Sequence, residues 1–293
     1  MSAIKAFVKK HPYLIYFILT FVISWGGLFL VSGGPGGFPK SKEQFQDMLP
    51  VFIPLVLIGP STAGMVMTAL VDGKAGFSDL LSRFLNWRVG IHWYAVALLT
   101  APLVLISVLL ALSLFSPVYL PGIFVSSDRV PLLLSGIAAG LLVGFLEELG
   151  WTGFATPRLR KQYSAITTGL IIGVIWGAWH IFFNVIWISG AYSGGMPPVV
   201  FIATGILVDL VGQLPAYRVL MVWVHDHTRS LLLAMLMHAS LTTTTIIVEP
   251  PGISGATLLV YSLVPAAAMW LIVAAVAVAT RGELEMKRAG QAG

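Results

Sequence analysis

The sequence predicts an all-α, polytopic integral membrane protein with eight transmembrane helices and both termini in the cytoplasm. Three observations support this fold class. First, 57% of the 293 residues are hydrophobic and only 10% are charged, whereas soluble domains carry about 25% charged residues. Second, the chain contains eight apolar runs of about 18 residues or more, the length at which a helix crosses the hydrocarbon core. Third, basic residues collect in alternate connections between these runs.

The predicted spans are separated by stretches rich in glycine and proline, which mark loops rather than helix interiors. The first run, of about 19 residues, is too long for the apolar core of a cleaved signal peptide, so we expect it to remain as a helix. In chain order, the spans are Tyr13 to Val31, Leu49 to Val71, His92 to Phe115, Val130 to Gly150, Ala165 to Ile188, Pro198 to Leu220, Ser230 to Val248 and Thr257 to Thr280.

The connection at 73–90 is too polar to span. Its apolar residues recur at the spacing of one helix face, so it predicts an amphipathic helix along the cytoplasmic interface.

The orientation follows from the basic residues. With a cytoplasmic N-terminus, all but three of the 17 Lys and Arg residues fall on the cytoplasmic side, and the exceptions are Lys40, Lys42 and Arg129. This is the distribution expected for membrane proteins, and one missing or extra span would scramble it. Basic residues that lie between apolar runs do not form a nucleic-acid surface, so we expect no nucleic-acid partner. The sequence therefore predicts a single membrane domain over residues 1–293.

The chain contains no cysteine, which excludes disulfides, thiol nucleophiles and cysteine-based metal sites. Charged groups in hydrocarbon cost about 2.5–3.5 kcal/mol each on insertion scales, so ionisable residues inside spans are the clearest functional indicators. Five acidic or histidine residues lie in the interior of the predicted spans, and they are Glu147, Glu148, His180, Asp209 and His238. They are the first candidates for a site.

Glu147 and Glu148 follow a long apolar run and have no basic residue one helical turn away. Neighbouring carboxylates repel each other, and an unpaired carboxylate is a candidate general base. The structural alternative is that both lie solvated at the inner interface beside Arg158 and Arg160.

His180 shares a helix face with Trp176 and Asn184 at four-residue spacing, and Thr242 follows His238 by one turn. Each histidine alone could be a neutral group bonded to a neighbouring helix. Two histidines and two glutamates from three spans could instead bind a metal ion or activate water.

Three segments in this order resemble the motifs of the CPBP family of intramembrane proteases, which includes the Rce-type CAAX prenyl endopeptidases and the bacterial Abi proteins. The segments are EELGWTGFATPRL at 147–159, WGAWH at 176–180 and RSLLLAMLMHAS at 229–240. The likeness covers roughly residues 50–245, which we take as the protease core. It implies an eight-span fold and hydrolysis of a membrane-associated peptide.

By this resemblance, Glu147 matches the catalytic glutamate and His180 the histidine that activates water with it. His238 matches a histidine that stabilises the oxyanion, and Glu148 matches a supporting glutamate. The catalytic candidates are Glu147, Glu148, His180, Asn184, His238 and Thr242.

The chain departs from the family pattern at two positions. Thr152 stands where the first motif often has an arginine, so an arginine that orients the glutamates would have to come from Arg158 or Arg160 folding back. Thr242 stands where the third motif often has asparagine or aspartate. A threonine donates one hydroxyl hydrogen bond, and Asn184 could substitute.

We therefore expect an intramembrane endopeptidase with a polar cavity open to the cytoplasm, using either no cofactor or one zinc ion held by Glu147, Glu148, His180 and His238. Its partners would be membrane lipid and a membrane-associated protein or peptide, either CAAX-type and prenylated or not, in a prokaryotic cell membrane.

Two other functions remain open at this point. Thr152 and Thr242 favour a catalytically weak or inactive family member that binds a membrane partner in an immunity or scaffold role. Intramembrane Glu and His residues are also expected in a proton-coupled transporter. The sequence does not indicate the oligomeric state.

Overall fold

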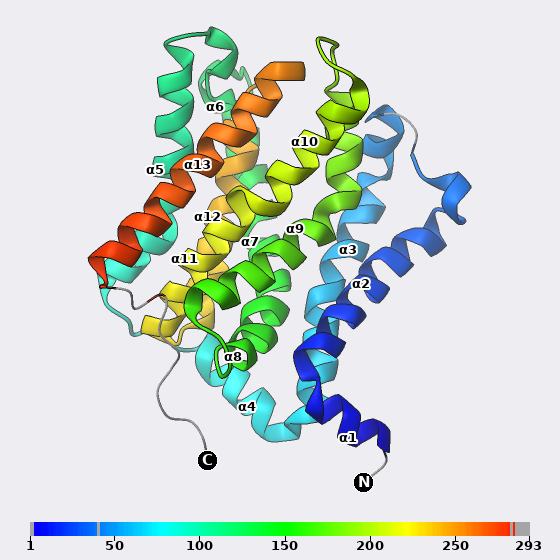
Figure 1. Ribbon diagram of the computed structural model, residues 1–293, viewed down its shortest axis with the longest axis vertical. Helices are drawn as coiled ribbons and strands as arrows, with labels where there is room; N and C mark the ends of the chain where they lie inside the picture. The colour runs from blue at the N-terminus through cyan, green and yellow to red at the C-terminus, as the bar shows by residue number, and fades with distance from the viewer. Residues whose placement is uncertain (1–2, 40–41, 282–283, 285–293) are drawn as a thin grey trace.

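The computed structural model describes residues 3–39, 42–281 and 284. The described part is built from helices joined by short turns, and it contains no β-strand. The helices (Figure 1) are α1 (Ala3–Lys10), α2 (Pro12–Val31), α3 (Lys42–Val71), α4 (Gly73–Phe84), α5 (Ile91–Ser113), α6 (Gly122–Val125), α7 (Arg129–Gly150), α8 (Thr156–Leu159), α9 (Ala165–Gly190), α10 (Pro198–Val211), α11 (Gln213–Thr228), α12 (Leu231–Val248) and α13 (Gly255–Ala279). Short 3₁₀ turns lie at Pro35–Gly37 and Pro117–Tyr119, and a π-helical turn joins α7 to α8.

Among the described residues, eight helical segments are long and apolar enough to cross a membrane. The prediction of eight spans is therefore confirmed, and the chain is a multi-pass integral membrane protein. Two spans run further than predicted. The fourth continues past Gly150 to Leu159, and the sixth consists of α10 and α11, separated by a break at Gly212. The sixth span ends at Thr228 rather than Leu220, so the prediction that Arg218 lies on the cytoplasmic side was wrong: this residue is buried within α11.

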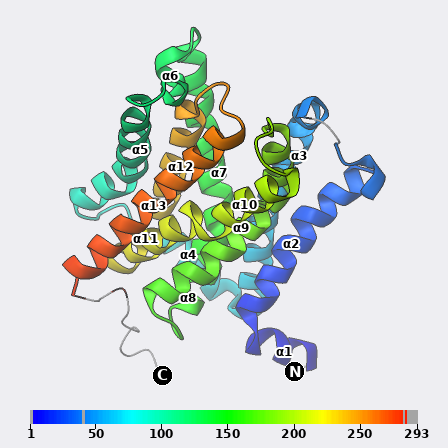
Figure 2. The same cartoon turned by 45° about the horizontal axis from the view of Figure 1, so that its top comes forward.

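The helices form two layers. Helices α2, α3, α7, α12 and α5 pack side by side in one layer, and α9, α10, α11 and α13 form the other. The second layer crosses in front of α7 and α12 in both views (Figures 1 and 2). Glycines allow the closest approaches, because a Cβ atom at Gly144 would lie 2.5 Å from the Met235 carbonyl of α12. Gly173 does the same for α9 against α11, where a Cβ atom would lie 2.4 Å from Cα of Pro215.

Several prolines inside the helices create sites at which a neighbouring helix can form a hydrogen bond. A proline inside a helix lacks the N–H that would bond to the carbonyl four residues earlier. In four places within the described chain, that carbonyl instead accepts a hydrogen bond from a side chain of another helix. Ser24 donates to the Val56 carbonyl, four residues before Pro60, at 2.8 Å, and Ser240 donates to the Leu98 carbonyl, four residues before Pro102, also at 2.8 Å. Trp270 donates to the Val211 carbonyl, four residues before Pro215, at 3.1 Å. Arg83 donates to the Gly153 carbonyl, four residues before Pro157, at 2.8 Å. Each interruption in a helix is thereby tied to a neighbouring helix.

Candidate active site

The glutamate pair lies at the end of α7, where the helix widens into the π-helical turn Trp151–Ala155. Two features favour this turn. Pro157 cannot donate to the Gly153 carbonyl, and the Thr156 hydroxyl bonds to the Trp151 carbonyl at 2.8 Å, five residues back. Single π-turns inside α-helices occur frequently at functional sites. Here the turn follows Glu147 and Glu148 directly.

Glu147 is held by two tryptophans. Its Oε2 atom accepts hydrogen bonds from Nε1 of Trp151 at 3.1 Å and Nε1 of Trp176 at 2.8 Å. An indole nitrogen can only donate, so the two bonds require an acceptor oxygen at this point. Glu147 is 1% exposed and lines the cavity described below. The carboxylate is thus fixed from one side and presented to the cavity from the other.

Glu148 points to a different environment. Both of its oxygens bind the guanidinium of Arg218, with Nη1–Oε2 at 2.8 Å and Nη2–Oε1 at 2.9 Å. Nδ1 of His238 lies 2.8 Å from Oε1, and the Thr152 hydroxyl donates to Oε2. The side chains of Glu148 and Arg218 are fully buried. Glu148 therefore supports the site from behind.

Neither Arg158 nor Arg160 folds back onto the glutamates. Arg158 pairs with Asp72 and donates to the Phe154 carbonyl at 2.7 Å. Arg160 pairs with Asp226 at 2.7 Å. The arginine that meets the carboxylate is Arg218, from a helix that begins 65 residues after Glu148.

The sequence contained a signal for Arg218 that the prediction missed. A single arginine with apolar residues on both sides, in the stretch Tyr217 to Val224, is typical of a buried cation with a partner elsewhere. The two tryptophans that bind Glu147 also lay inside the motif segments, but nothing in their spacing indicated which atom they would contact.

In both histidines, Nδ1 is held by a hydrogen bond and Nε2 remains free of one. Nδ1 of His180 lies 2.9 Å from the Trp176 carbonyl, and Nδ1 of His238 lies 2.8 Å from the Glu148 carboxylate. Both partners are acceptors, so Nδ1 carries a hydrogen in each ring. Both residues line the cavity. Nε2 of each is therefore the atom left for water or substrate.

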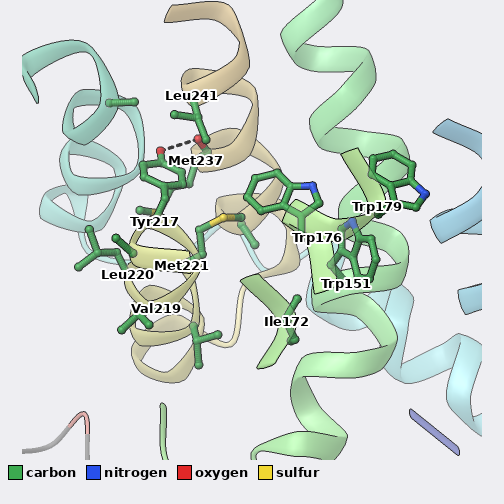
Figure 3. Close-up of a cluster of buried hydrophobic side chains, with 14 of the residues drawn as sticks. Trp151, Ile172, Trp176, Trp179, Tyr217, Val219, Leu220, Met221, Met237 and Leu241 are labelled. Atoms are coloured by element: carbon green, nitrogen blue, oxygen red, sulfur yellow. Dashed lines mark hydrogen bonds between the residues drawn. The ribbon is translucent and has the colours of Figure 1, made fainter. Parts of the chain in front are cut away.

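Packing around the site holds these helices in register. The Tyr217 hydroxyl donates to the Met237 carbonyl at 2.8 Å, the dashed line in Figure 3. These residues precede Arg218 and His238 in the chain, so the bond aligns α11 with α12 beside Glu148. Trp151, Trp176 and Trp179 form the aromatic part of the same buried region (Figure 3).

A cavity of about 480 Å³ brings five of the six catalytic candidates together. The five are Glu147, His180, Asn184, His238 and Thr242, and the sixth, Glu148, lies behind His238. Most of the other lining residues are aliphatic or aromatic, and they come from α3, α5, α7, α9, α10, α11, α12 and α13. The expectation of a polar cavity was therefore wrong for most of its wall. The side chain of Asp209, the fifth ionisable residue found in a predicted span, lies outside the described residues.

The predicted four-residue zinc set does not fit this geometry. No group of three or more His, Asp or Glu side chains in the described ranges is arranged to hold a metal ion. Glu148 is already bound by the Arg218 guanidinium. A cation so close to a carboxylate repels a second cation, which removes one of the four expected ligands.

Comparison with known proteins gives two matches. Residues 129–244, from α7 to α12, match the family model described as type II CAAX prenyl endopeptidase Rce1-like. The chain is also 25% identical over 191 residues to CAAX prenyl protease 2 of Methanococcus maripaludis. That alignment covers 63% of this chain and 66% of the relative, slightly less than two thirds of its length. All six catalytic candidates and Arg218 fall within the family match.

Proposed function

We propose that this protein is an intramembrane endopeptidase that hydrolyses a peptide bond of a membrane-associated protein or peptide, and the match of residues 129–244 to the Rce1-like family model supports this proposal. The observation that carries the proposal is the convergence of Glu147, His180 and His238 on one cavity within the membrane-spanning helices. Peptide hydrolysis requires a base for water and donors for the developing oxyanion. These side chains supply both.

In the proposed mechanism, a water molecule bound between Glu147 and Nε2 of His180 transfers a proton to Glu147 as its oxygen adds to the peptide carbonyl, while Nε2 of His180 accepts a hydrogen bond from the other O–H of the water. The carbonyl oxygen becomes an oxyanion and accepts hydrogen bonds from His238 with Thr242 or Asn184. The proton then passes to the leaving amine as the C–N bond breaks. The two indole donors keep Glu147 oriented throughout.

His238 can donate from Nε2 only when both ring nitrogens carry a hydrogen. In the proposed mechanism both nitrogens carry one at this step, and the Glu148 carboxylate accepts the hydrogen bond from Nδ1. In this mechanism Glu148, which the family resemblance implied to be a supporting glutamate, acts through the oxyanion donor His238 rather than through Glu147. No metal ion takes part in this mechanism.

The cavity indicates the substrate class. Its largely apolar wall, formed by residues such as Leu57, Leu142, Phe183, Leu241 and Ile246, fits apolar side chains or an isoprenoid next to the scissile bond. The relative's name refers to CAAX prenyl proteins. We propose a CAAX-type prenylated peptide as the first substrate to test, in a prokaryotic cell membrane.

The binding-only alternative loses one of its two supports. It depended on the absence of an arginine at Thr152 and of an amide at Thr242. The Glu148 carboxylate has an arginine partner in Arg218, so Thr152 no longer argues for an inactive site.

The test compares new protein N-termini by mass spectrometry in cells that carry wild type or Glu147→Gln at equal expression. Loss of a general base lowers the rate by about 10²- to 10⁴-fold. We expect N-termini that appear with wild type and disappear with Glu147→Gln. Purified protein in liposomes should then cleave the prenylated form of such a peptide.

Glu249→Gln is the matched control, because it makes the same change just after α12, away from the cavity lining. It should keep every new N-terminus. If wild type and Glu147→Gln give the same N-termini, the protein is not a protease that uses Glu147. If liposomes cleave the prenylated and unprenylated peptides equally, the isoprenoid part of the proposal is wrong.

A further inference from the structure

The side chain of Arg218 reaches the back of the candidate site without lining the cavity. Its two terminal nitrogens bind both oxygens of Glu148, and the guanidinium lies 4.4 Å from the centroid of the Trp176 ring. Both side chains of the pair are 0% exposed. A buried ion pair of this kind is costly to break, because the remaining partner keeps an uncompensated charge.

Arg218 shares one carboxylate oxygen with a histidine of the cavity. Oε1 of Glu148 accepts from Nη2 of Arg218 at 2.9 Å and from Nδ1 of His238 at 2.8 Å. The two-pronged contact fixes the plane of the carboxylate, which a single contact would not do. The position of Oε1 in turn determines which nitrogen of His238 carries a hydrogen and where Nε2 points.

We propose that Arg218 is the positioning residue of the candidate site: through Glu148 it holds a hydrogen at Nδ1 of His238 and fixes the orientation of the ring, so that Nε2 is placed to act as the oxyanion donor when it also carries a hydrogen. Thr152 is its partner in this task, because its hydroxyl reaches the second carboxylate oxygen, Oε2, which Nη1 of Arg218 also binds. The role of His238 rests on the proposed function, whereas the effect of Arg218 on the His238 ring does not.

Position 152 offers a route to the same carboxylate. It lies on the same helical segment as Glu148, one turn later, and its side chain already contacts Oε2. An arginine at 152 should therefore restore the ion pair when the volume of Arg218 is removed. An arginine at 152 instead of 218 separates a positioning role from general packing. It restores the positive charge and the two-pronged hydrogen bonding to Glu148, but it does not restore the side chain at position 218.

The experiment uses the full chain in lipid nanodiscs with Arg218→Met, Arg218→Lys and the double variant Thr152→Arg/Arg218→Ala. The first readout is ¹⁵N NMR of labelled histidines, with the His238 signal assigned by its loss in His238→Asn. We expect wild type to show Nδ1 protonated, Arg218→Met to show mixed tautomers, and the double variant to regain the wild-type signal. Unchanged His238 signals in folded Arg218→Met would overturn the proposal.

The second readout is kcat and KM on a cleaved peptide. Loss of an oxyanion donor lowers kcat by about 10²- to 10³-fold, and we expect this loss in Arg218→Met with KM changed less than about threefold. Arg218→Met should add little to the loss in His238→Asn. The double variant should recover at least about tenfold in kcat. Additive losses, or no recovery in a folded double variant, would contradict the proposal.

Arg160→Met is the matched control. Arg160 is also buried, at 4% exposed, and also pairs with a carboxylate on α11, that of Asp226, but it does not line the cavity. It should leave the His238 signal and kcat unchanged. If Arg218→Met does not fold, Arg218→Lys and the double variant decide the question. If wild type cleaves nothing while the NMR shifts occur as expected, the proposed function fails and the positioning role stands.

Discussion

The indole of Trp176 lies against four residues of the candidate site, which are Glu147, His180, His238 and Arg218. Its Nε1 donates to Glu147 at 2.8 Å, and its ring lies 5.7 Å from His180 and 4.8 Å from His238, measured between ring centroids. The guanidinium of Arg218 covers its face. A phenylalanine at this position would preserve most of the packing and remove the hydrogen bond. Trp176→Phe therefore tests the Nε1 hydrogen bond separately from the packing of the aromatic ring.

We predict that Trp176→Phe lowers kcat by about 10- to 100-fold, because a hydrogen bond to a charged group is worth about 1.5–3 kcal/mol. Steady-state cleavage of a peptide in liposomes measures it. Trp179→Phe is the control: Nε1 of Trp179 is buried without a hydrogen-bond partner. Its loss should change kcat less than about threefold and leave the unfolding temperature equal or higher. Equal losses in the two variants would show that Glu147 does not depend on the indole donor.

A second prediction at this scale concerns metal ions. The Glu148 carboxylate is occupied by Arg218 and His238, so we expect cleavage to continue after dialysis against EDTA and 1,10-phenanthroline. Metal analysis should find less than about 0.1 zinc ion per chain. Loss of activity that zinc alone restores would mean that the histidines bind a metal despite the arginine.

The sequence identifies some site residues more readily than others. Glu147, His180 and His238 could be selected because ionisable side chains inside apolar spans are rare. Arg218 could be selected in the same way, but its partner could not, because that carboxylate lies 70 residues earlier in the chain. The bonds from Trp151 and Trp176 to Glu147 likewise depend on how α7 and α9 pack, which no local pattern records.

At the scale of elements, the amphipathic connection does more than cover the interface. Helix α4 begins at Gly73, directly after Asp72, and its Arg83 donates to the Gly153 carbonyl of the π-turn at 2.8 Å. Asn86, just beyond the helix, donates to the Thr228 carbonyl at the end of α11 at 2.9 Å. This segment thus ties together the ends of the two helices that supply Glu148 and Arg218. The sequence predicted its amphipathic character but none of these contacts.

The proline-linked hydrogen bonds give a test at the same scale. We predict that Ser24→Ala lowers the free energy of unfolding by about 1–3 kcal/mol, because it leaves the buried Val56 carbonyl without a donor. In Ser24→Ala/Pro60→Ala, the new N–H at residue 60 can bond to that carbonyl, so the loss should be smaller than in Ser24→Ala alone. Denaturant titration in mixed micelles measures both.

Ser113→Ala is the control for this cycle, because the Ser113 hydroxyl is exposed and bonds to Leu110 in its own helix. Its effect should stay within about 0.5 kcal/mol. If Pro60→Ala lowers the free energy of unfolding further when it is added to Ser24→Ala, the Ser24 hydroxyl does not stabilise the protein through the Val56 carbonyl.

At the scale of the whole molecule, length and apolar character were enough to predict the eight spans, since a helix must be about 20 residues long to cross the hydrocarbon core. They did not predict the break at Gly212, which divides the sixth span into α10 and α11. They also did not predict the two layers, because the order of spans in the chain does not determine which helices are neighbours. The cavity lies between these layers.

Most residues that line the cavity lie in the halves of their helices away from the start of α1 and the end of α13. Its α3 residues lie at 53–57, in the first half of the helix, and its α9 and α12 residues at 176–184 and 238–246, in the second halves. At the opposite end, Trp151 and Phe154 are fully buried. With the basic loops in the cytoplasm, we predict that substrate reaches the cavity from the opposite side of the membrane rather than from the cytoplasm, the side that the sequence suggested.

The absence of cysteine allows both points to be tested with single-cysteine variants and a membrane-impermeant maleimide. Lys161→Cys, between α8 and α9, lies at the basic end, and Ser127→Cys, just before α7, lies at the other end. Because positive charge is retained in the cytoplasm, we predict that intact cells label Ser127→Cys and leave Lys161→Cys unlabelled until the membrane is opened. Asn184→Cys, in the cavity wall, should be labelled in intact cells and protected by a peptide substrate. Labelling of Lys161→Cys alone in intact cells would reverse the topology, whereas labelling of Asn184→Cys only from the cytoplasmic side would place the substrate entrance among the basic loops.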